Sequence, residues 1–189
     1  MKSNSISLIG YRAVGKSTIG ALLAKKLNLP VLCSDSLIEE YVQMNIAQFV
    51  QQKGWPIFRE IEKLILRKIV DQTLQSPYVI ISGGGVVIDS ENRDLLRSCS
   101  LVYWLQADVL TIQKRLDLNC ERRPPLQSNC AVNEVEEVLK QRTPLYQITC
   151  NQIINTASYS VEESVYAIIQ HYRAQNIVSS FNQEIISKG

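Results

Sequence analysis

The stretch GYRAVGKST, residues 10–18, decides the fold class of this 189-residue chain. It matches the pattern G-x-x-x-x-G-K-[ST] and lies between an apolar run, residues 5–9, and a segment with helical periodicity, residues 16–28. In such a setting, backbone N–H groups turn inward around a phosphate and the helix N-terminus adds positive potential. The alternative is a glycine turn capped by Ser17, but a chance match is expected in fewer than about one chain in a hundred of this length. The motif therefore predicts a binding site for a nucleoside triphosphate.

Two side chains of this loop have expected tasks. Lys16 is expected to bridge the β- and γ-phosphates, and the Ser17 hydroxyl is expected to ligate Mg²⁺. The residues of the loop that are expected to bind the nucleotide are Gly10, Ala13, Val14, Gly15, Lys16, Ser17 and Thr18.

Apolar runs and helical stretches alternate along the rest of the chain. Strands are predicted at residues 5–9, 31–33, 78–81, 101–105 and 152–154. Helices are predicted at 16–28, 90–97, 109–116, 133–146 and 161–174, with two or three more between 34 and 74, of which the longest spans 56–74. Residues 117–129 predict a mobile loop, and the last dozen residues predict a frayed tail. Apolar strands that alternate with helices predict an α/β fold, in which helices cover both faces of a parallel sheet.

The composition is that of one ordinary globular domain spanning residues 1–189. Apolar residues make up 46% of the chain and the net charge is +2, so charge favours neither nucleic acid nor a membrane as a partner. No apolar run is long enough to cross a bilayer. The five cysteines are widely spaced and contain no C-x-x-C, which indicates reduced thiols in a cytoplasmic protein. His171 is the only histidine, which argues against histidine metal sites and His-based triads.

A second set of residues indicates a second substrate. The strand at 78–81 leads into three glycines, residues 83–85, where a GTPase or motor ATPase has an aspartate for Mg²⁺. Glycines there let backbone N–H groups approach a ligand closely, although a tight turn is the simpler interpretation. Arg59 and Arg142, each taken alone, are typical of solvated surface charges. Together with Asp35 they form a cradle for a small hydroxy acid, with arginines for the carboxylate and the aspartate for a hydroxyl.

Taken together and in this order, these motifs and the loop ERRPPL, residues 121–126, resemble the shikimate kinase family, from about residue 5 to residue 172. The resemblance implies a P-loop NTPase fold like that of nucleoside monophosphate kinases: a five-stranded parallel sheet of order 2-3-1-4-5, helices on both faces and a mobile lid. It also implies the reaction, transfer of the γ-phosphate of ATP to the 3-hydroxyl of shikimate with Mg²⁺, which gives shikimate 3-phosphate and ADP. The expected protein is a monomer with a substrate-binding segment at 33–62, a lid at 117–129 and a tail at 176–189.

The resemblance also assigns roles to single residues. Asp35 matches the aspartate that hydrogen-bonds the accepting hydroxyl, and Arg59 and Arg142 match the arginines that hold the carboxylate. Glu62, one turn beyond Arg59, is expected to hold that guanidinium in place. Catalytic roles are implied for Lys16, Asp35 and Arg123, ATP contacts also for Arg115 (at the adenine) and Arg123 (in the lid), and substrate contacts for Asp35, Arg59, Gly83, Gly84, Gly85 and Arg142.

The chain departs from the family pattern at four places. Cys33-Ser34-Asp35 stands where the family has D-x-D, so the first acid, which helps to organise Mg²⁺, is replaced by a thiol. KGWPI, residues 53–57, replaces an acidic stretch, Pro125 stands where leucine is usual, and the loop 155–160 lacks its usual arginine and proline. Cys33 is expected to weaken metal support without abolishing it. Two alternatives stay open: a catalytically weak relative that binds nucleotide, and a gluconokinase-like small-molecule kinase.

Overall fold

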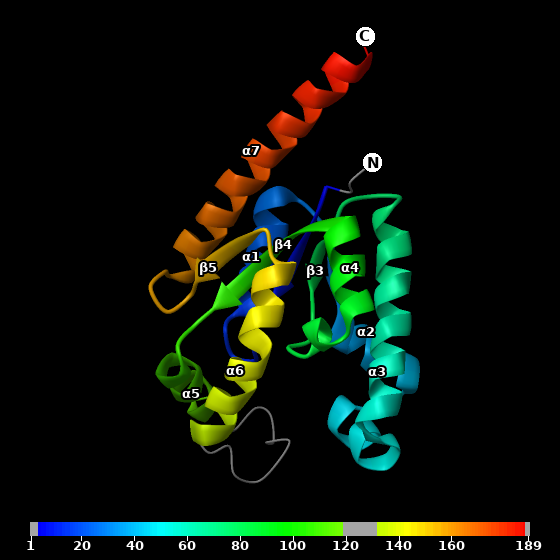
Figure 1. The fold of residues 1–189 in the computed structure, drawn as a ribbon, viewed down its shortest axis with the longest axis vertical. Coiled ribbons are helices and arrows are strands. Elements are labelled where there is room, and N and C mark those ends of the chain that lie inside the picture. Colours follow the sequence, from blue (N-terminus) through cyan, green and yellow to red (C-terminus); the bar gives the residue numbers. More distant parts are fainter. Residues whose placement is uncertain (1–3, 119–131, 188–189) are drawn as a thin grey trace.

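A five-stranded parallel sheet forms the centre of the protein (Figure 1). The computed structural model describes residues 4–118 and 132–187, with side chains described for 4–118 and 134–177. The strands are β1 (Ser5–Ile9), β2 (Val31–Cys33), β3 (Val79–Ile81), β4 (Ser100–Gln106) and β5 (Gln152–Asn155). Their order is β2-β3-β1-β4-β5, and every neighbouring pair is parallel, which confirms the predicted 2-3-1-4-5 sheet.

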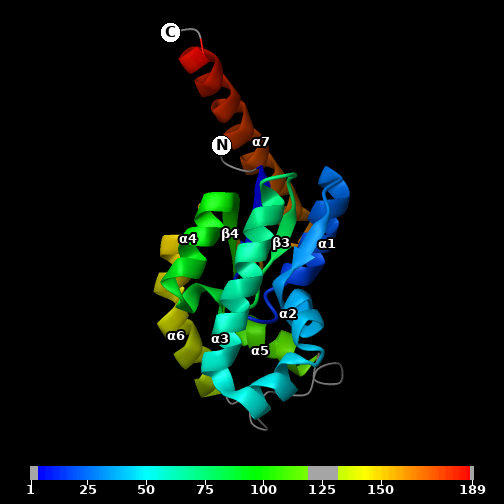
Figure 2. The same ribbon diagram turned by 90° about the vertical axis from the view of Figure 1, so that its right-hand side faces the viewer.

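Helices cover both faces of this sheet (Figure 2). On one face Leu23 and Ile168 pack in the same buried cluster as Leu8, and on the other Ile65 and Leu96 pack with Ile80. Both faces of the central strands are therefore buried, which explains why β1 is buried at every position. The helices are α1 (Lys16–Leu27), α2 (Ser34–Val42), α3 (Ile46–Thr73), α4 (Ser90–Cys99), α5 (Val109–Asp117), α6 (Val132–Thr149) and α7 (Val161–Ser187), with a short 3₁₀ turn, η1 (Val86–Ile88), before α4.

The long helix α3 is bent at Gly54, which the sequence placed ahead of the helix. Gly54 has φ 81° and ψ 164°, a conformation that is open to glycine and interrupts the helix. Pro56 follows in the first turn of the second part, where its missing N–H costs nothing. The prediction of a helix at 56–74 is therefore confirmed for this second part of α3.

The end of the chain differs from its prediction. The sequence predicts a frayed tail at 176–189, but α7 continues through Ser187 and extends away from the sheet (Figure 1). Between Val161 and Ser187 there is no glycine or proline that would end a helix, so the backbone continues from the docked first turns. The lid predicted at 117–129 lies almost entirely outside the described residues, and Arg123 and Pro125 with it. Among the helices of the described residues, none is long and apolar enough to cross a membrane.

Candidate active site

Three of the predicted motifs meet at one edge of the sheet because they follow three neighbouring parallel strands. The phosphate loop follows β1, Asp35 follows β2 and the glycines 83–85 follow β3. β1 and β2 both pair with β3, and Cys33 lies opposite Ile81 in the register. Crevices at the carboxyl ends of parallel strands are the usual ligand sites of such sheets.

The phosphate loop has the backbone conformation that its glycines allow. Gly10 (φ 137°) and Gly15 (φ 97°) both have positive φ, as does Ala13 (φ 63°). A Cβ at Gly10 would also collide with the carbonyl oxygen of Leu105, so no larger residue fits there. Gly15 is the residue that precedes the first turn of α1, and the loop therefore delivers the chain directly to a helix N-terminus.

The side chains of the loop differ in what they can offer a nucleotide. The ammonium of Lys16 donates to the carbonyl oxygens of Gly10 (2.7 Å) and Tyr11 (2.8 Å), so it lies across the loop. The side chains of Ser17 and Thr18 are exposed, whereas Val14 is 1% exposed and packs in the core. Of the predicted nucleotide contacts, Val14 can therefore contribute only its backbone.

Each glycine of the segment 83–85 packs closely against a different part of the site. A Cβ at Gly83 would lie 2.6 Å from Oδ1 of Asp35, and one at Gly85 would lie 2.8 Å from Nη1 of Arg59. A Cβ at Gly84 would lie 3.4 Å from the carbonyl oxygen of Gly10, at the start of the phosphate loop. We call this segment the glycine corner. It brings Asp35, Arg59 and the phosphate loop together, as the sequence predicted.

The backbone of the glycine corner is held by three side chains. The carbonyl oxygen of Gly84 accepts hydrogen bonds from Nη1 of Arg142 (3.2 Å) and from the hydroxyl of Tyr146 (2.5 Å). The N–H of Gly83 donates to Oγ of Ser34 (3.0 Å). Sequence reasoning assigned Arg142 to the substrate but missed Ser34 and Tyr146. Their only signal was position, because Ser34 directly precedes Asp35 and Tyr146 ends the stretch QRTPLY, residues 141–146, which contains Arg142.

Tyr146 is itself fixed in place. It is fully buried, and its ring stacks on Trp104 with the centroids 5.6 Å apart and an interplanar angle of 22°. Burial raises the pKa of Tyr146 to about 12, so its hydroxyl keeps its proton and remains a donor to Gly84.

Arg59 is held on its own helix, as predicted. Its Nη1 donates to Oε2 of Glu62 over 2.6 Å, and its guanidinium lies 5.2 Å from the ring centroids of both Trp55 and Phe58. Glu62 is only 2% exposed. Burial raises the pKa of Glu62 and the charge of Asp35 raises it further, although Arg59 acts in the opposite direction.

Arg115 joins the phosphate loop to the segment after β5. Its Nη2 donates to the carbonyl oxygen of Thr156 (2.6 Å), and its Nη1 donates to Oγ1 of Thr156 (3.1 Å) and to the carbonyl oxygen of Ala13 (3.5 Å). The guanidinium thus lies beside the loop that is expected to hold the nucleotide. Its stacking on adenine stays a prediction.

Cys33 is the last residue of β2 and the N-cap of α2. Its thiol is free and partly buried, and its backbone is extended (φ −102°, ψ 113°). Within the described residues there is no group of three or more His, Cys, Asp or Glu side chains that could hold a metal ion. Oxygen ligands for a cation at this edge could come from the Ser17 hydroxyl, the nucleotide and water.

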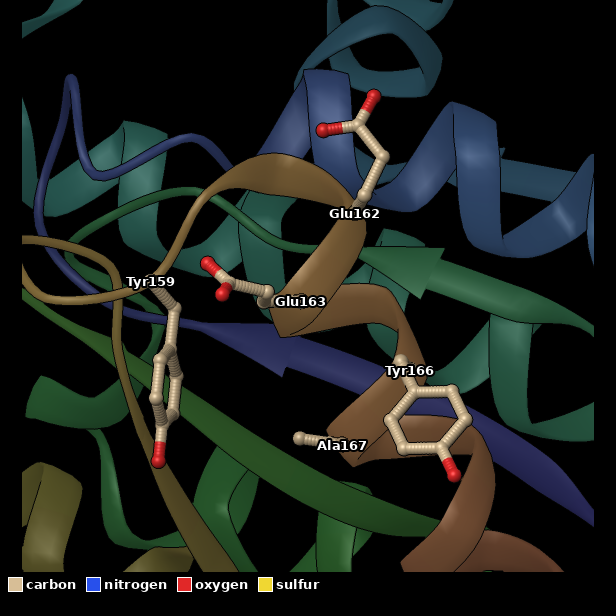
Figure 3. A pocket seen from close by; sticks show the side chains of 5 residues that line it. All are labelled: Tyr159, Glu162, Glu163, Tyr166 and Ala167. Atoms are coloured by element: carbon tan, nitrogen blue, oxygen red, sulfur yellow. The ribbon is translucent and has the colours of Figure 1, made fainter.

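A hollow of about 540 Å³ lies elsewhere, at the start of α7 (Figure 3). Its polar groups include Glu163, which accepts hydrogen bonds from the N–H and the hydroxyl of Ser160, both at 2.8 Å. Ser160 and Glu163 therefore cap the N-terminus of α7. The lining residues are Tyr159, Glu162, Glu163, Tyr166 and Ala167, and none of them belongs to the predicted site.

A phosphate loop that faces an acid, two arginines and a glycine corner defines a P-loop kinase for a small anionic molecule. Residues 12–173 match the family model described as shikimate kinase. The chain belongs to the shikimate kinase family.

Individual relatives agree with this assignment. The chain is similar to shikimate kinase 2 of Photorhabdus laumondii subsp. laumondii, with 34% identity over 174 residues that cover 91% of this chain and 97% of the relative. It is 33% identical over 182 residues to the shikimate kinase of Syntrophus aciditrophicus, covering 90% and 92% of the two chains. The solved structure of a shikimate kinase from Acinetobacter baumannii in complex with shikimate superposes with a TM-score of 0.82 at 27% identity, covering 90% of this chain and 93% of that one.

Proposed function

We propose that this protein transfers the γ-phosphate of ATP to the 3-hydroxyl of shikimate, giving shikimate 3-phosphate and ADP. The observation that carries the proposal is the glycine corner, because its three consecutive residues lie against Asp35, the phosphate loop and Arg59. An acid, a carboxylate-binding arginine and a phosphate cradle are the groups that a hydroxy-acid kinase needs within one substrate length of each other.

The two arginines bind the carboxylate of the substrate in this proposal. Arg59 is 21% exposed, and Glu62 and two aromatic rings restrict its guanidinium, so little side-chain entropy is lost on binding. Arg142 belongs to α6, and its hydrogen bond to the carbonyl oxygen of Gly84 holds it at the glycine corner. With the carboxylate fixed beside Gly85, Asp35 beside Gly83 accepts the proton of the attacking hydroxyl.

Lys16 and the helix N-terminus act on the nucleotide. The ammonium donates to two loop carbonyls, and in this proposal it turns to a phosphate that enters the loop. There it offsets the charge that develops on the β- and γ-oxygens. Arg115 from its place beside Ala13, and Arg123 from the lid, are proposed to complete the contacts to ATP.

The residues at this edge fit an Mg²⁺ ion that enters with ATP. The exposed hydroxyl of Ser17 is the proposed protein ligand, and the absence of a carboxylate cluster among the described residues agrees with a cation that keeps most of its waters. Bound there, Mg²⁺ would neutralise phosphate charge. ATP and shikimate are the partners that this function requires, and because one chain supplies all the named residues, the monomer suffices.

The test is a coupled ADP-release assay with shikimate, gluconate and nucleoside monophosphates as acceptors. Shikimate alone is expected to give turnover, and ³¹P NMR should identify the product as the 3-phosphate. Asp35→Asn is expected to lower kcat by about a hundredfold or more, the usual range for loss of a positioned proton acceptor, without changing the affinity for ATP. Turnover with gluconate but not shikimate would replace the proposal by the gluconokinase-like alternative.

A second candidate is a catalytically weak relative that binds nucleotide. Cys33 is the observation that favours it, because a thiol stands where the family has an acid. Tight ATP binding with no turnover of any of these acceptors would support this candidate.

A further inference from the structure

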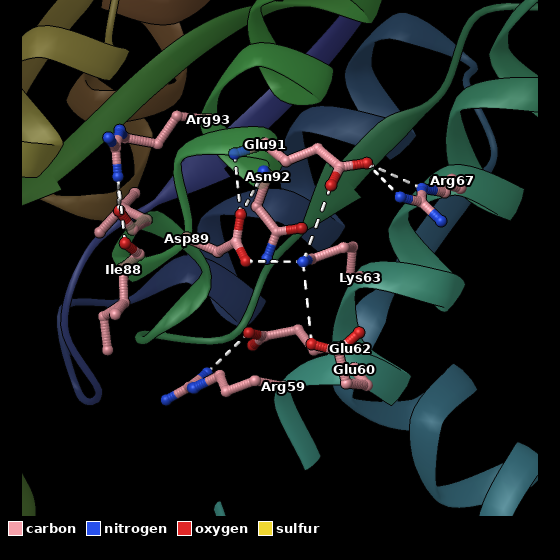
Figure 4. A network of polar contacts seen from close by, with 11 residues as sticks. Arg59, Glu60, Glu62, Lys63, Arg67, Ile88, Asp89, Glu91, Asn92 and Arg93 are labelled. Atoms are coloured by element: carbon pink, nitrogen blue, oxygen red, sulfur yellow. Dashed lines mark hydrogen bonds and ion pairs between the residues drawn. The ribbon is translucent and has the colours of Figure 1, made fainter. Parts of the chain in front are cut away.

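A lysine beside the candidate active site joins two segments that are far apart in the sequence (Figure 4). Nζ of Lys63 lies 3.0 Å from Oδ2 of Asp89 and 3.7 Å from Oε2 of Glu91. Lys63 belongs to α3, whereas Asp89 is the N-cap of α4. The side chain of Lys63 is 17% exposed and that of Asp89 is 25% exposed, so solvent screens this ion pair only in part.

Asp89 also organises the start of α4 through its other oxygen. Oδ1 accepts hydrogen bonds from the N–H groups of Glu91 (2.8 Å) and Asn92 (3.4 Å). Nη1 of Arg93 donates to the carbonyl oxygens of Val87 (2.7 Å) and Ile88 (3.1 Å), just before the cap. The 3₁₀ turn η1 is therefore fixed to the first turn of the helix that Lys63 contacts.

The same short turn connects Asp89 to the glycine corner. The N–H of Ile88 donates to the carbonyl oxygen of Gly85 (3.0 Å), and the N–H of Val86 donates to that of Gly83 (3.2 Å). On the side of α3, Lys63 is the residue after Glu62, which holds Arg59. The Lys63–Asp89 pair thus joins the element that carries Arg59 to the element that carries Gly85.

The position of Gly85 relative to Arg59 matters because the two are already in close contact. A Cβ at Gly85 would lie within 2.9 Å of Cζ of Arg59, so the guanidinium occupies space that only glycine leaves open. A small shift of η1 relative to α3 would move this guanidinium or leave a gap beside it. Misplacement of about 1 Å is enough to impair a site of this kind.

We propose that the Lys63–Asp89 ion pair positions Gly85 and Arg59 relative to each other and so sets the affinity for the carboxylate of shikimate. The proposal rests on the proposed function. Lys63 and Asp89 are positioning residues, and they act through Arg59.

The chain offers a matched control on the same helix. Arg67, one turn after Lys63, also pairs with Glu91 but has no contact with Asp89 among the described residues. Its side chain is 53% exposed. Loss of Arg67 therefore removes an ion pair between α3 and α4 without releasing the cap residue.

The experiment measures kcat and the KM values for shikimate and ATP in four variants of the full chain. Lys63→Met is expected to raise the KM for shikimate by about three- to tenfold, the effect of losing a partly buried ion pair, while kcat and the KM for ATP stay within about twofold. Asp89→Asn should do the same, because asparagine still caps the helix but does not attract the ammonium. Lys63→Arg keeps the positive charge and should therefore have a KM for shikimate close to that of the unmodified chain, and Arg67→Met should leave this KM unchanged.

Further measurements decide whether Lys63 and Asp89 position the site through one shared interaction or only stabilise the fold. The double variant Lys63→Met/Asp89→Asn should be no worse than either single variant, because both remove the same interaction. An unchanged KM for shikimate in Asp89→Asn, or equal losses for both substrates, would overturn the proposal, even if Lys63→Met melts too early to be assayed. If the unmodified chain does not phosphorylate shikimate, the proposed function fails, and that result is separate from any effect of the variants.

Discussion

Oε2 of Glu62, a carboxylate with 2% exposure, accepts a 2.6 Å hydrogen bond from Nη1 of Arg59 one turn earlier on α3. Burial of this carboxylate raises its pKa, and the charge of Asp35 adds to the rise, while Arg59 partly offsets it. Glu62 therefore takes up a proton at a higher pH than an ordinary glutamate. Because the protonated form lacks the charge that holds Arg59, the grip on the substrate carboxylate depends on this equilibrium.

The first prediction is a pH dependence that belongs to Glu62. As the pH falls through the raised pKa of Glu62, above the ordinary value of 4.5, the KM for shikimate should rise. Glu62→Gln should raise that KM about tenfold near pH 7, since it replaces a charge-assisted bond by a neutral one, and should abolish the dependence on pH in this window. The measurement is KM against pH for both proteins. A Gln variant with the same profile as the unmodified chain would assign the titration to another group.

The contribution of Glu62 to stability should change with pH in the opposite sense to substrate binding: at low pH binding weakens, whereas folding is favoured. The folded state binds the proton of Glu62 more tightly than the unfolded chain does, so this residue favours folding most below pH 4.5. That contribution is lost as the pH rises through the raised pKa. Glu62→Gln should flatten this part of the stability curve, which thermal unfolding across the same pH range would reveal.

The second prediction separates the two arginines. Arg59→Ala and Arg142→Ala should each weaken shikimate binding by about 2 kcal/mol, the range for loss of a charge-assisted partner, with little change in ATP affinity. Arg59→Ala should also lower Tm, because it leaves the buried Glu62 without its cation. Arg142→Ala should lower Tm less, because Tyr146 still donates to the carbonyl oxygen of Gly84. Equal losses of ATP and shikimate binding would mean that the arginines are structural.

The third prediction uses two neighbouring glycines as controls for each other. A methyl group at Gly83 would meet Asp35, and a methyl group at Gly85 would meet Arg59. Gly83→Ala should therefore mainly lower kcat, by about tenfold or more, and Gly85→Ala should mainly raise the KM for shikimate, because in each case the group that moves is the end of a side chain. Steady-state kinetics of the two variants is the measurement. Identical effects of both substitutions would contradict the separate placement of Asp35 and Arg59.

Local sequence patterns predicted the alternating strands and helices and part of the site, whereas the order of the strands came from the family resemblance. The phosphate loop was predictable because its glycines, lysine and flanking periodicity act within a dozen residues. The meeting of Asp35 with the glycine corner was predictable because parallel strands end at one edge. The bonds of Tyr146 and the Lys63–Asp89 pair were not, because they join separate elements through tertiary packing. The helical end of α7 was missed because low periodicity does not prevent a helix that is already nucleated from continuing.

The last prediction concerns Cys33 and the metal. Cys33 is the N-cap residue of α2, two residues before Asp35, but its thiol makes no capping hydrogen bond. A carboxylate there would accept bonds from water bound to Mg²⁺ and would offset positive charge, so Cys33→Asp should lower the free Mg²⁺ needed for half-maximal rate.

Aspartate also caps helices, and Cys33→Asn provides the control because it caps α2 without adding charge. Both variants are expected to melt at or slightly above the temperature of the unmodified chain, since capping is worth about 1 kcal/mol. Only Cys33→Asp should change the Mg²⁺ dependence of ADP release. If both variants lower the Mg²⁺ requirement equally, the effect comes from ordering α2 and Asp35. If Cys33→Asp melts much earlier and needs as much Mg²⁺ as before, Cys33 is a packing residue whose replacement buries an unpaired charge.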